Sequence, residues 1–126
     1  MHSSRRLALV SLSIALSGCA LLGFGPPTGL VEGDVFLVES AEPIPHAEVC
    51  VFGMDTTCVR ANDQGHYRVR LPEQTITLRF RSGQLTPAAS DTLRVTPPGR
   101  YQVDCGVSGR LVISDRPLRC QPLPGR

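Results

Sequence analysis

Residues 65–81, GHYRVRLPEQTITLRFR, decide the fold because they hold two alternating segments separated by a proline. In residues 66–71, apolar side chains alternate with His and Arg, and in residues 75–81 they alternate with Thr and Arg. A period of two is typical of a strand that buries one face and exposes the other. We therefore predict two strands, with Tyr67 and Phe80 as large side chains of the core.

The same alternation continues on both sides, with no helical stripe of useful length. Further strands are predicted at residues 31–38, 47–52, 57–61, 92–96, 101–104 and 111–113. Seven or eight short strands, separated by turn residues at roughly eight-to-twelve-residue spacing, indicate an all-β sandwich or barrel. Because one face of each strand is apolar and the other polar, we expect two sheets on a shared core.

Charge and length limit the possible functions. The chain has 126 residues, enough for one domain, and all thirteen basic residues are arginines. Arg5 and Arg6 lie in a segment that we expect to be removed, which leaves eleven arginines against eleven acidic residues. Residues of the two signs are interspersed. A nucleic-acid surface needs clustered positive charge, so we expect no nucleic-acid partner.

The N-terminus has the three parts of a secretory signal peptide. Residues 1–6 are polar and carry two arginines, residues 7–16 are apolar apart from two serines, and Ser17 and Gly18 are small. The positive end stays in the cytoplasm while the apolar stretch enters the membrane. We therefore predict an N-terminal signal helix over residues 1–18.

The end of this segment, Leu16-Ser17-Gly18-Cys19, resembles the lipobox of bacterial lipoproteins at all four positions. The resemblance implies that the Cys19 thiol receives a diacylglycerol, that the chain is cut between Gly18 and Cys19, and that the new amino group is acylated. Two or more acyl chains hold a protein firmly on a bilayer. Ala20 stands where an aspartate would retain the protein in the inner membrane, so the resemblance implies an outer-membrane protein facing the periplasm.

Two other interpretations of the N-terminus stay open. Residues 7–25 contain no charged side chain and are about long enough to span a bilayer as an uncleaved anchor. A conventional signal peptide that is cleaved at another position is the second alternative.

Cleavage before Cys19 would leave 108 of the 126 residues, in three parts. Residues 19–29 form a short tether rich in Gly and Pro, which would hold the next domain close to the membrane. Residues 30–120 carry the alternating strands and form the predicted β-sandwich. Residues 121–126 form a Pro-rich tail.

Residues 33–85 resemble the carboxypeptidase regulatory-like domain, whose pattern reads G-x-V, P-x-x-G-A-x-V-x-V, T-D-x-x-G-x-[FY] and L-P. The matching segments are, in chain order, GDV at 33–35, PIPHAEVCV at 43–51, ANDQGHY at 61–67 and LP at 71–72. His46 stands where the family usually has Gly. Gly65 suits a positive φ, and Asn62 and Asp63 suit hydrogen bonds to turn backbone. The resemblance implies a transthyretin-like, seven-stranded sandwich that acts as a folding, spacing or binding module, with no catalytic residues to carry over.

Four cysteines remain besides Cys19, and an even number in an exported chain favours disulfides. Four cysteines allow three pairings. We favour Cys50–Cys58, because these residues lie on two strands joined by a short hairpin. The other pair is then Cys105–Cys120, which would pin the Pro-rich tail to a strand.

The sequence contains no recognisable catalytic or metal-binding set. There is no C-x-x-C, and His46 and His66 are isolated, so we expect no metal and no cofactor. No serine lies in G-x-S-x-G, which argues against a hydrolase. We predict His66 to be a surface residue. Four arginines are predicted to line one outer sheet face: Arg68, Arg70, Arg79 and Arg81.

Together these patterns predict a non-enzymatic lipoprotein of the cell envelope, anchored by lipid on Cys19. It would be a structural or interaction module for an envelope protein or a glycan. The alternative is a carrier of a small ligand or carbohydrate, which needs a lined cavity or an exposed aromatic platform. An envelope enzyme is a third hypothesis.

Overall fold

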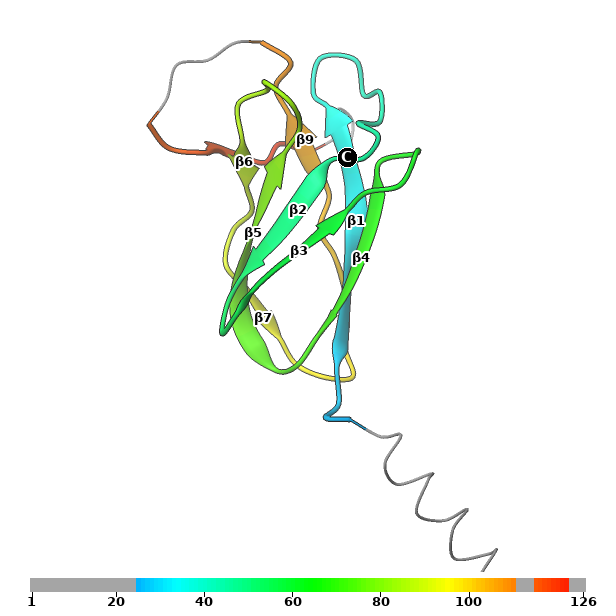
Figure 1. Cartoon of the computed structure of the whole chain (residues 1–126), viewed down its shortest axis with the longest axis vertical. Coiled ribbons are helices and arrows are strands. Elements are labelled where there is room, and N and C mark those ends of the chain that lie inside the picture. The colour runs from blue at the N-terminus through cyan, green and yellow to red at the C-terminus, as the bar shows by residue number, and fades with distance from the viewer. Residues whose placement is uncertain (1–24, 111–114, 123–126) are drawn as a thin grey trace, which may run out of the picture.

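The computed structural model describes residues 25–110 and 115–122, which form two β-sheets packed face to face (Figure 1). These residues contain no helix. Their strands are, in chain order, β1 (Gly29–Leu37), β2 (Glu48–Phe52), β3 (Thr56–Arg60), β4 (His66–Leu71), β5 (Gln74–Arg81), β6 (Ala88–Ala89), β7 (Leu93–Val95), β8 (Arg100–Gln102), β9 (Cys105–Val107) and β10 (Leu118–Arg119).

β1 is the central strand of a four-stranded sheet. β4 pairs with it antiparallel on one side, and β8 and β9 pair with it parallel on the other. β8 lies beside residues 30–32 and β9 beside residues 35–37. The two short strands are therefore two parts of one interrupted edge.

The second sheet has the order β10-β6-β5-β2-β3, and β7 also pairs with β5. β2 pairs with β5 antiparallel along five positions. On the other side of β5, β7 pairs with residues 74–76 and β6 with residues 79–80. This edge is interrupted in the same way, and β10 extends it beyond β6.

The core lies between the sheets and contains the apolar faces that the alternation predicts. Tyr67 of β4 and Phe80 of β5 are 1% and 0% exposed, and their rings meet edge to face with centroids 5.6 Å apart. The Tyr67 hydroxyl donates a hydrogen bond to the Val103 carbonyl at 2.6 Å. The prediction that both rings lie in the core is confirmed, and the pair joins the two sheets.

The all-β class and the two sheets are confirmed, but the predicted count of seven to eight strands is wrong. The described residues hold ten strands. β6, β9 and β10 are additional, because their two or three residues lie outside the alternating segments, whereas the three-residue β7 and β8 lie in or next to the alternating segments 92–96 and 101–104. The strand predicted at residues 111–113 and the signal helix over residues 1–18 lie outside the described residues.

The interruption between β8 and β9 is built around Gly33. The Val103 N–H donates to the Glu32 carbonyl at 2.8 Å, and the Asp34 N–H donates to Asp104 Oδ1 at 2.9 Å. A Cβ atom at Gly33 would lie 1.9 Å from the Val103 carbonyl oxygen. Only a residue without a side chain lets the edge strand approach β1 this closely.

The interruption between β6 and β7 is built around Ser90. The Ser90 N–H donates to the Leu78 carbonyl at 2.8 Å, while the Leu78 N–H donates to Ser90 Oγ at 2.9 Å. The hydroxyl thus replaces a main-chain acceptor where the strand leaves the ladder.

The turn before β4 uses the residues that the sequence indicates. Asn62 Oδ1 accepts hydrogen bonds from the N–H groups of Gln64 and His66, at 2.9 and 3.0 Å. Gly65 adopts a φ of 75°. These findings confirm the predicted roles of Asn62 and Gly65, whereas the contact of the Asp63 carboxylate is with the His46 ring.

His46 occupies the turn position where the resembled family usually has Gly. Its φ is 59°, in the left-handed region that favours glycine. Its N–H donates to the Asn62 carbonyl at 3.2 Å, and its Nε2 lies 2.9 Å from Asp63 Oδ1. The glycine-like backbone is therefore retained with a histidine.

One end of the sandwich, the lower end in Figure 1, is here called the tether end. It contains Thr28 before β1, and the turns at residues 53–55, 72–73 and 96–99 that follow β2, β4 and β7. Gly29 pairs with Leu71 at this end. The chain therefore enters the sandwich beside these three turns.

Candidate functional site

The predicted lipidation and cleavage site, Gly18 and Cys19, lies outside the described residues, so it stays a prediction. The described chain starts at Gly25 and enters β1 at Gly29. Strand pairing thus begins at the last residue of the predicted tether. Within residues 25–110 and 115–122, no helix has the length and apolar character needed to cross a bilayer.

The disulfide predicted between Cys50 and Cys58 is present. The two residues face each other directly in the antiparallel pair of β2 and β3, with Cα atoms 4.0 Å apart. Cys58 is exposed, so the bridge reaches the outer surface of the hairpin.

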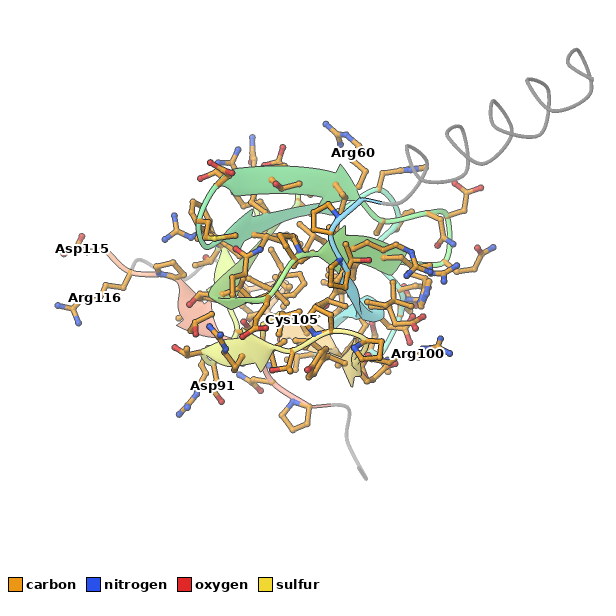
Figure 2. The ribbon with its side chains drawn as sticks, turned by 90° about the horizontal axis from the view of Figure 1, so that it is seen from below. Arg60, Asp91, Arg100, Cys105, Asp115 and Arg116 are labelled. Carbon is orange, nitrogen blue, oxygen red and sulfur yellow. A yellow bond between two sulfur atoms is a disulfide. The ribbon has the colours of Figure 1, made fainter. Side chains whose placement is uncertain are left out.

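The second predicted disulfide, Cys105–Cys120, is also present, with Cα atoms 4.7 Å apart. Cys105 lies on β9, beside β1, and is 0% exposed (Figure 2). Cys120 directly follows β10 of the six-stranded sheet. The bridge therefore links the two sheets. Gln121, the first residue of the predicted tail, pairs with Gly106 through two backbone hydrogen bonds.

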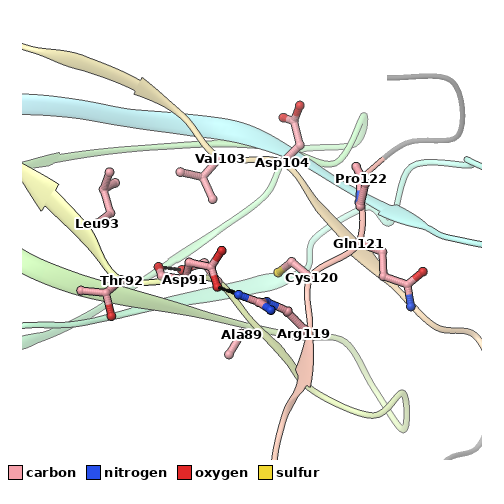
Figure 3. A pocket seen from close by; sticks show the side chains of 11 residues that line it. Ala89, Asp91, Thr92, Leu93, Val103, Asp104, Arg119, Cys120, Gln121 and Pro122 are labelled. Carbon is pink, nitrogen blue, oxygen red and sulfur yellow. Dashed lines mark hydrogen bonds and ion pairs between the residues drawn. The ribbon is translucent and has the colours of Figure 1, made fainter.

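A cleft of about 380 Å³ lies next to this second disulfide and is here called the polar cleft (Figure 3). It is formed by the segment that joins β6 to β7, the Val103–Asp104 break and the chain around β10. Its lining residues are Ala89, Ser90, Asp91, Thr92, Leu93, Val103, Asp104, Arg119, Cys120, Gln121 and Pro122. Most of the surface that lines the cleft is apolar, and the name refers to the carboxylate, guanidinium, hydroxyl and amide groups among its lining residues, which include no aromatic ring.

The charged centre of the polar cleft is the pair Asp91–Arg119. Arg119 Nη2 and Nε donate to Asp91 Oδ1 at 2.5 and 3.1 Å. This hydrogen-bonded carboxylate raises the pKa of Arg119 above its ordinary value. Both side chains are more than 70% exposed, so each can give up its ion pair with the other and bind a polar ligand instead. Chemically, this pair can bind a hydroxyl or charged group of a ligand, while the rest of the lining is mostly apolar.

The predicted surface histidine, His66, is only one-third exposed and lies between two carboxylates. Its Nδ1 is 3.1 Å from Asp34 Oδ1, and its Nε2 is 3.3 Å from Glu32 Oε1. In the described part of the chain, its side-chain partners are these two acids, and the partner of His46 is Asp63. The structure therefore places neither histidine with a serine.

No group of three or more His, Cys, Asp or Glu side chains within residues 25–110 and 115–122 is placed to hold a metal ion. The serine of the polar cleft, Ser90, already uses its hydroxyl in main-chain bonds to Leu78 and Asp91. These contacts make the hydroxyl a structural group of the β6–β7 break.

The prediction of one arginine-lined face is wrong. Arg68 and Arg70 lie on β4 in the four-stranded sheet, whereas Arg79 and Arg81 lie on β5 in the other sheet. The turn at Pro72 carries the chain from one sheet to the other. The two pairs therefore lie on opposite outer faces of the sandwich.

Sequence reasoning missed the polar cleft. Asp91 and Arg119 are 28 residues apart, and what joins them is the parallel pairing of β6 with β10. Two-residue strands give no periodic signal. The nearest available clue was Cys120, because its predicted bridge to Cys105 places the neighbouring Arg119 against the sandwich.

Neither a scan against models of known protein families nor a search of curated protein sequences found a match for the chain. Solved proteins that are similar to the chain in structure include the following three. The first, "a putative carbohydrate binding protein" from Bacteroides uniformis ATCC 8492, is 19% identical. The match covers 66% of this chain and 42% of that protein, with a TM-score of 0.54.

The second is catechol 1,2-dioxygenase from Acinetobacter sp. ADP1, inhibited by bound mercury. It is 10% identical, with 77% of this chain and 59% of the dioxygenase covered and a TM-score of 0.55. The third is a DUF3823 family protein from Parabacteroides merdae ATCC 43184. It is 16% identical, with 72% and 51% covered and a TM-score of 0.51.

The chain spans about half the length of each of these proteins, between 42% and 59%. All three identities are below 20%. Likeness at this level shows a shared β-sandwich fold, and a fold alone does not carry a function.

Proposed function

We propose that the chain is a lipoprotein of the bacterial cell envelope, held on the membrane by lipid on Cys19. Its β-sandwich acts as a non-enzymatic structural or interaction module. The residue pattern of the carboxypeptidase regulatory-like domain in residues 33–85 supports this role. The membrane is the outer membrane, and the domain faces the periplasm.

One observation carries the anchoring proposal. Of the five cysteines, the four at positions 50, 58, 105 and 120 are joined in disulfides. Cys19 is left over, and it is the cysteine that ends the lipobox-like Leu16-Ser17-Gly18-Cys19. Its thiol is therefore the one available for a thioether to diacylglycerol.

Export is supported by the cross-links themselves. Disulfides persist in oxidising compartments such as the periplasm and are rare in the cytosol. Cys105–Cys120 joins the two sheets of the core, so the folded state is stabilised by a bond that forms only when the two thiols are oxidised.

Metabolic labelling with a palmitate analogue, followed by membrane fractionation, tests the proposal. Wild type should carry label and sediment with membranes, and Cys19→Ser should carry none. Cys58→Ser is the matched control, since it removes a sulfur but leaves the lipobox, and should keep its label. Equal labelling of wild type and Cys19→Ser would refute lipidation at this residue.

A second candidate function, binding of a carbohydrate or another small polar ligand, is favoured by the polar cleft. Its Asp91 and Arg119 offer the paired acceptor and donor groups that sugar hydroxyls use. One of the structurally similar proteins is described as a putative carbohydrate binding protein. The lack of an aromatic ring in the lining favours the first proposal.

A glycan array probed with the purified protein tests whether the polar cleft binds a carbohydrate. Binding that Asp91→Asn and Arg119→Gln each abolish, and that Arg81→Gln on another surface leaves intact, would support the carrier. Absence of binding from the whole array would leave the interaction module as the function.

A further inference from the structure

A second cleft, here called the basic cleft, lies at the tether end and has a volume of about 250 Å³. Its lining residues are Thr28, Leu30, Arg68, Arg70, Pro98, Gly99 and Arg100. Thr28 directly precedes β1, and Pro98 and Gly99 belong to the turn between β7 and β8. The cleft therefore opens where the predicted tether joins the sandwich.

Strand register places the arginines of this cleft side by side. Leu30 of β1 pairs with Arg70 of β4 on one side and with Arg100 of β8 on the other. Two residues further along β1, Glu32 pairs with Arg68. The three arginines thus lie around Leu30 and Glu32, the first two outward-facing residues of β1. Arg100 projects from the edge of the molecule (Figure 2).

The basic cleft carries an excess of positive charge. Arg100 Nη2 donates to Glu32 Oε2 at 2.9 Å, and this bond lowers the pKa of Glu32 below its ordinary value. Arg68 lies near enough to the same carboxylate to lower its pKa further. Among residues 25–110 and 115–122, no carboxylate forms an ion pair with Arg70. The cleft therefore holds three guanidinium groups beside one carboxylate, Glu32, which interacts with Arg100, Arg68 and His66.

The charge changes sign away from the tether end. On the same outer face, the next positions carry Asp34, which pairs with His66 of β4, and Asp104. Gln102 Nε2 donates to Asp104 Oδ1 at 2.7 Å. The face is therefore basic beside the predicted tether and acidic further along β1, so its charge is unevenly distributed between the two ends of the domain.

We propose that the basic cleft binds the phosphates of net anionic phospholipid headgroups, which no choline cation neutralises, in the same bilayer that holds Cys19; this rests on the proposed anchoring. Guanidinium groups bind phosphate oxygens through paired, charge-assisted hydrogen bonds. Eight residues separate Cys19 from Thr28, and the chain between these two residues spans at most about 30 Å when fully extended. An anchored chain therefore holds these arginines close to the lipid surface.

An apolar group at the same end fits this orientation. Met54 lies in the turn between β2 and β3 and is 65% exposed. Its N–H donates to Oε1 of the buried Gln74 at 2.9 Å, which fixes the turn. A flexible apolar side chain at the membrane-facing end can enter the interfacial region of a bilayer.

The test uses the full protein purified from membranes and reconstituted into two kinds of vesicle. One is made of phosphatidylcholine alone, and the other contains phosphatidylcholine and phosphatidylglycerol at a ratio of seven to three. Flotation on a density gradient measures anchoring. Phenylglyoxal, which modifies exposed arginines, is then applied, and each site is quantified by mass spectrometry.

We expect the protein to float with both vesicles. In the anionic vesicles, Arg68, Arg70 and Arg100 should react about fivefold more slowly than in neutral ones. This factor corresponds to an attraction of about 1 kcal/mol between an anionic surface and each nearby basic residue. One molar salt should remove the difference. Arg79 and Arg81, on the opposite sheet, are internal controls and should react equally in both.

Two substitutions and added inorganic phosphate serve as controls. Arg70→Gln should remove most of the protection of Arg68 and Arg100, whereas Arg81→Gln should leave it unchanged. Neutral vesicles in millimolar inorganic phosphate should give no protection. Full protection there would mean that the cleft takes free phosphate, which would overturn the membrane assignment.

The two proposals fail in different ways. A protein that does not float with neutral vesicles would contradict the anchor and remove the basis of this inference. A protein that floats with both vesicles, but whose five arginines react equally in the two, would contradict the basic cleft alone.

Discussion

Gly33 illustrates how one absent side chain shapes the molecule at the residue scale. The Val103 carbonyl lies over its Cα and also accepts the Tyr67 hydroxyl. A methyl group at Gly33 would have to displace this carbonyl, and with it the hydrogen bond from the core. The glycine of the G-x-V motif is thus required because the Val103 carbonyl packs against it.

We expect Gly33→Ala to lower the free energy of unfolding by about 3 kcal/mol, the upper part of the range for overpacking. Gly25→Ala is the control, because a Cβ there would meet no atom within 4 Å. Urea denaturation at neutral pH measures both. Equal stability of the two variants would show that the edge strand moves aside without cost.

Tyr67 predicts how stability depends on alkaline pH. Burial raises the pKa of Tyr67, and the charges of Asp104 and Asp34 add to the effect. Below pH 10 both the folded and the unfolded chain keep this phenol neutral. Above pH 10 only the unfolded chain ionises it, so the stability from Tyr67 is lost as the pH rises, by up to about 1.4 kcal/mol per unit.

Tyr67→Phe should lower the free energy of unfolding by about 1–2 kcal/mol at neutral pH, because the Val103 carbonyl loses its hydrogen-bond donor. The same variant should show a smaller further loss between pH 10 and pH 11 than wild type. Tyr101→Phe keeps Tyr67 and should retain the wild-type alkaline loss. An unchanged pH profile in Tyr67→Phe would contradict the assignment.

The disulfides belong to the scale of elements, since each joins two strands. Cys50–Cys58 closes one hairpin, whereas Cys105–Cys120 links the two sheets through the buried Cys105. We expect replacement of Cys105 and Cys120 by Ala to cost about 3–5 kcal/mol, and replacement of Cys50 and Cys58 about 2 kcal/mol. Thermal unfolding of the two double variants measures this order, and a reversed order would contradict it.

The strands that were predictable are those that lie in a sequence segment long enough to alternate. β4 and β5 show this directly, because Tyr67 and Phe80 take the buried positions that their pattern requires. β6 and β9 were not predictable. They exist because Ser90 and the Gly33 contact interrupt two edges, and interactions between distant segments leave no periodic trace in the sequence.

The arrangement of sites was less predictable than the fold. The disulfides could be paired from their spacing, and the structure confirms both bridges. The four arginines could not be assigned to faces, since the alternation of Arg68 and Arg79 is alike while their strands belong to different sheets. Neither cleft was visible, because each depends on which strands become neighbours.

At the scale of the whole molecule, the proposals describe a domain with a direction. Residues 25–28, the basic cleft and exposed Met54 lie at one end of the sandwich. The polar cleft lies beside β10, which pairs with β6, and we expect it to be open to a partner in the periplasm. The description depends on the chemistry of a single residue, Cys19.

The most direct measurement is the intact mass of the protein purified from native membranes, with its N-terminal peptide sequenced by fragmentation. The account predicts a chain that begins at Cys19 and carries a diacylglycerol and a further acyl group, with four cysteines in disulfides. A chain that begins at another residue, or an unmodified Cys19, would contradict it.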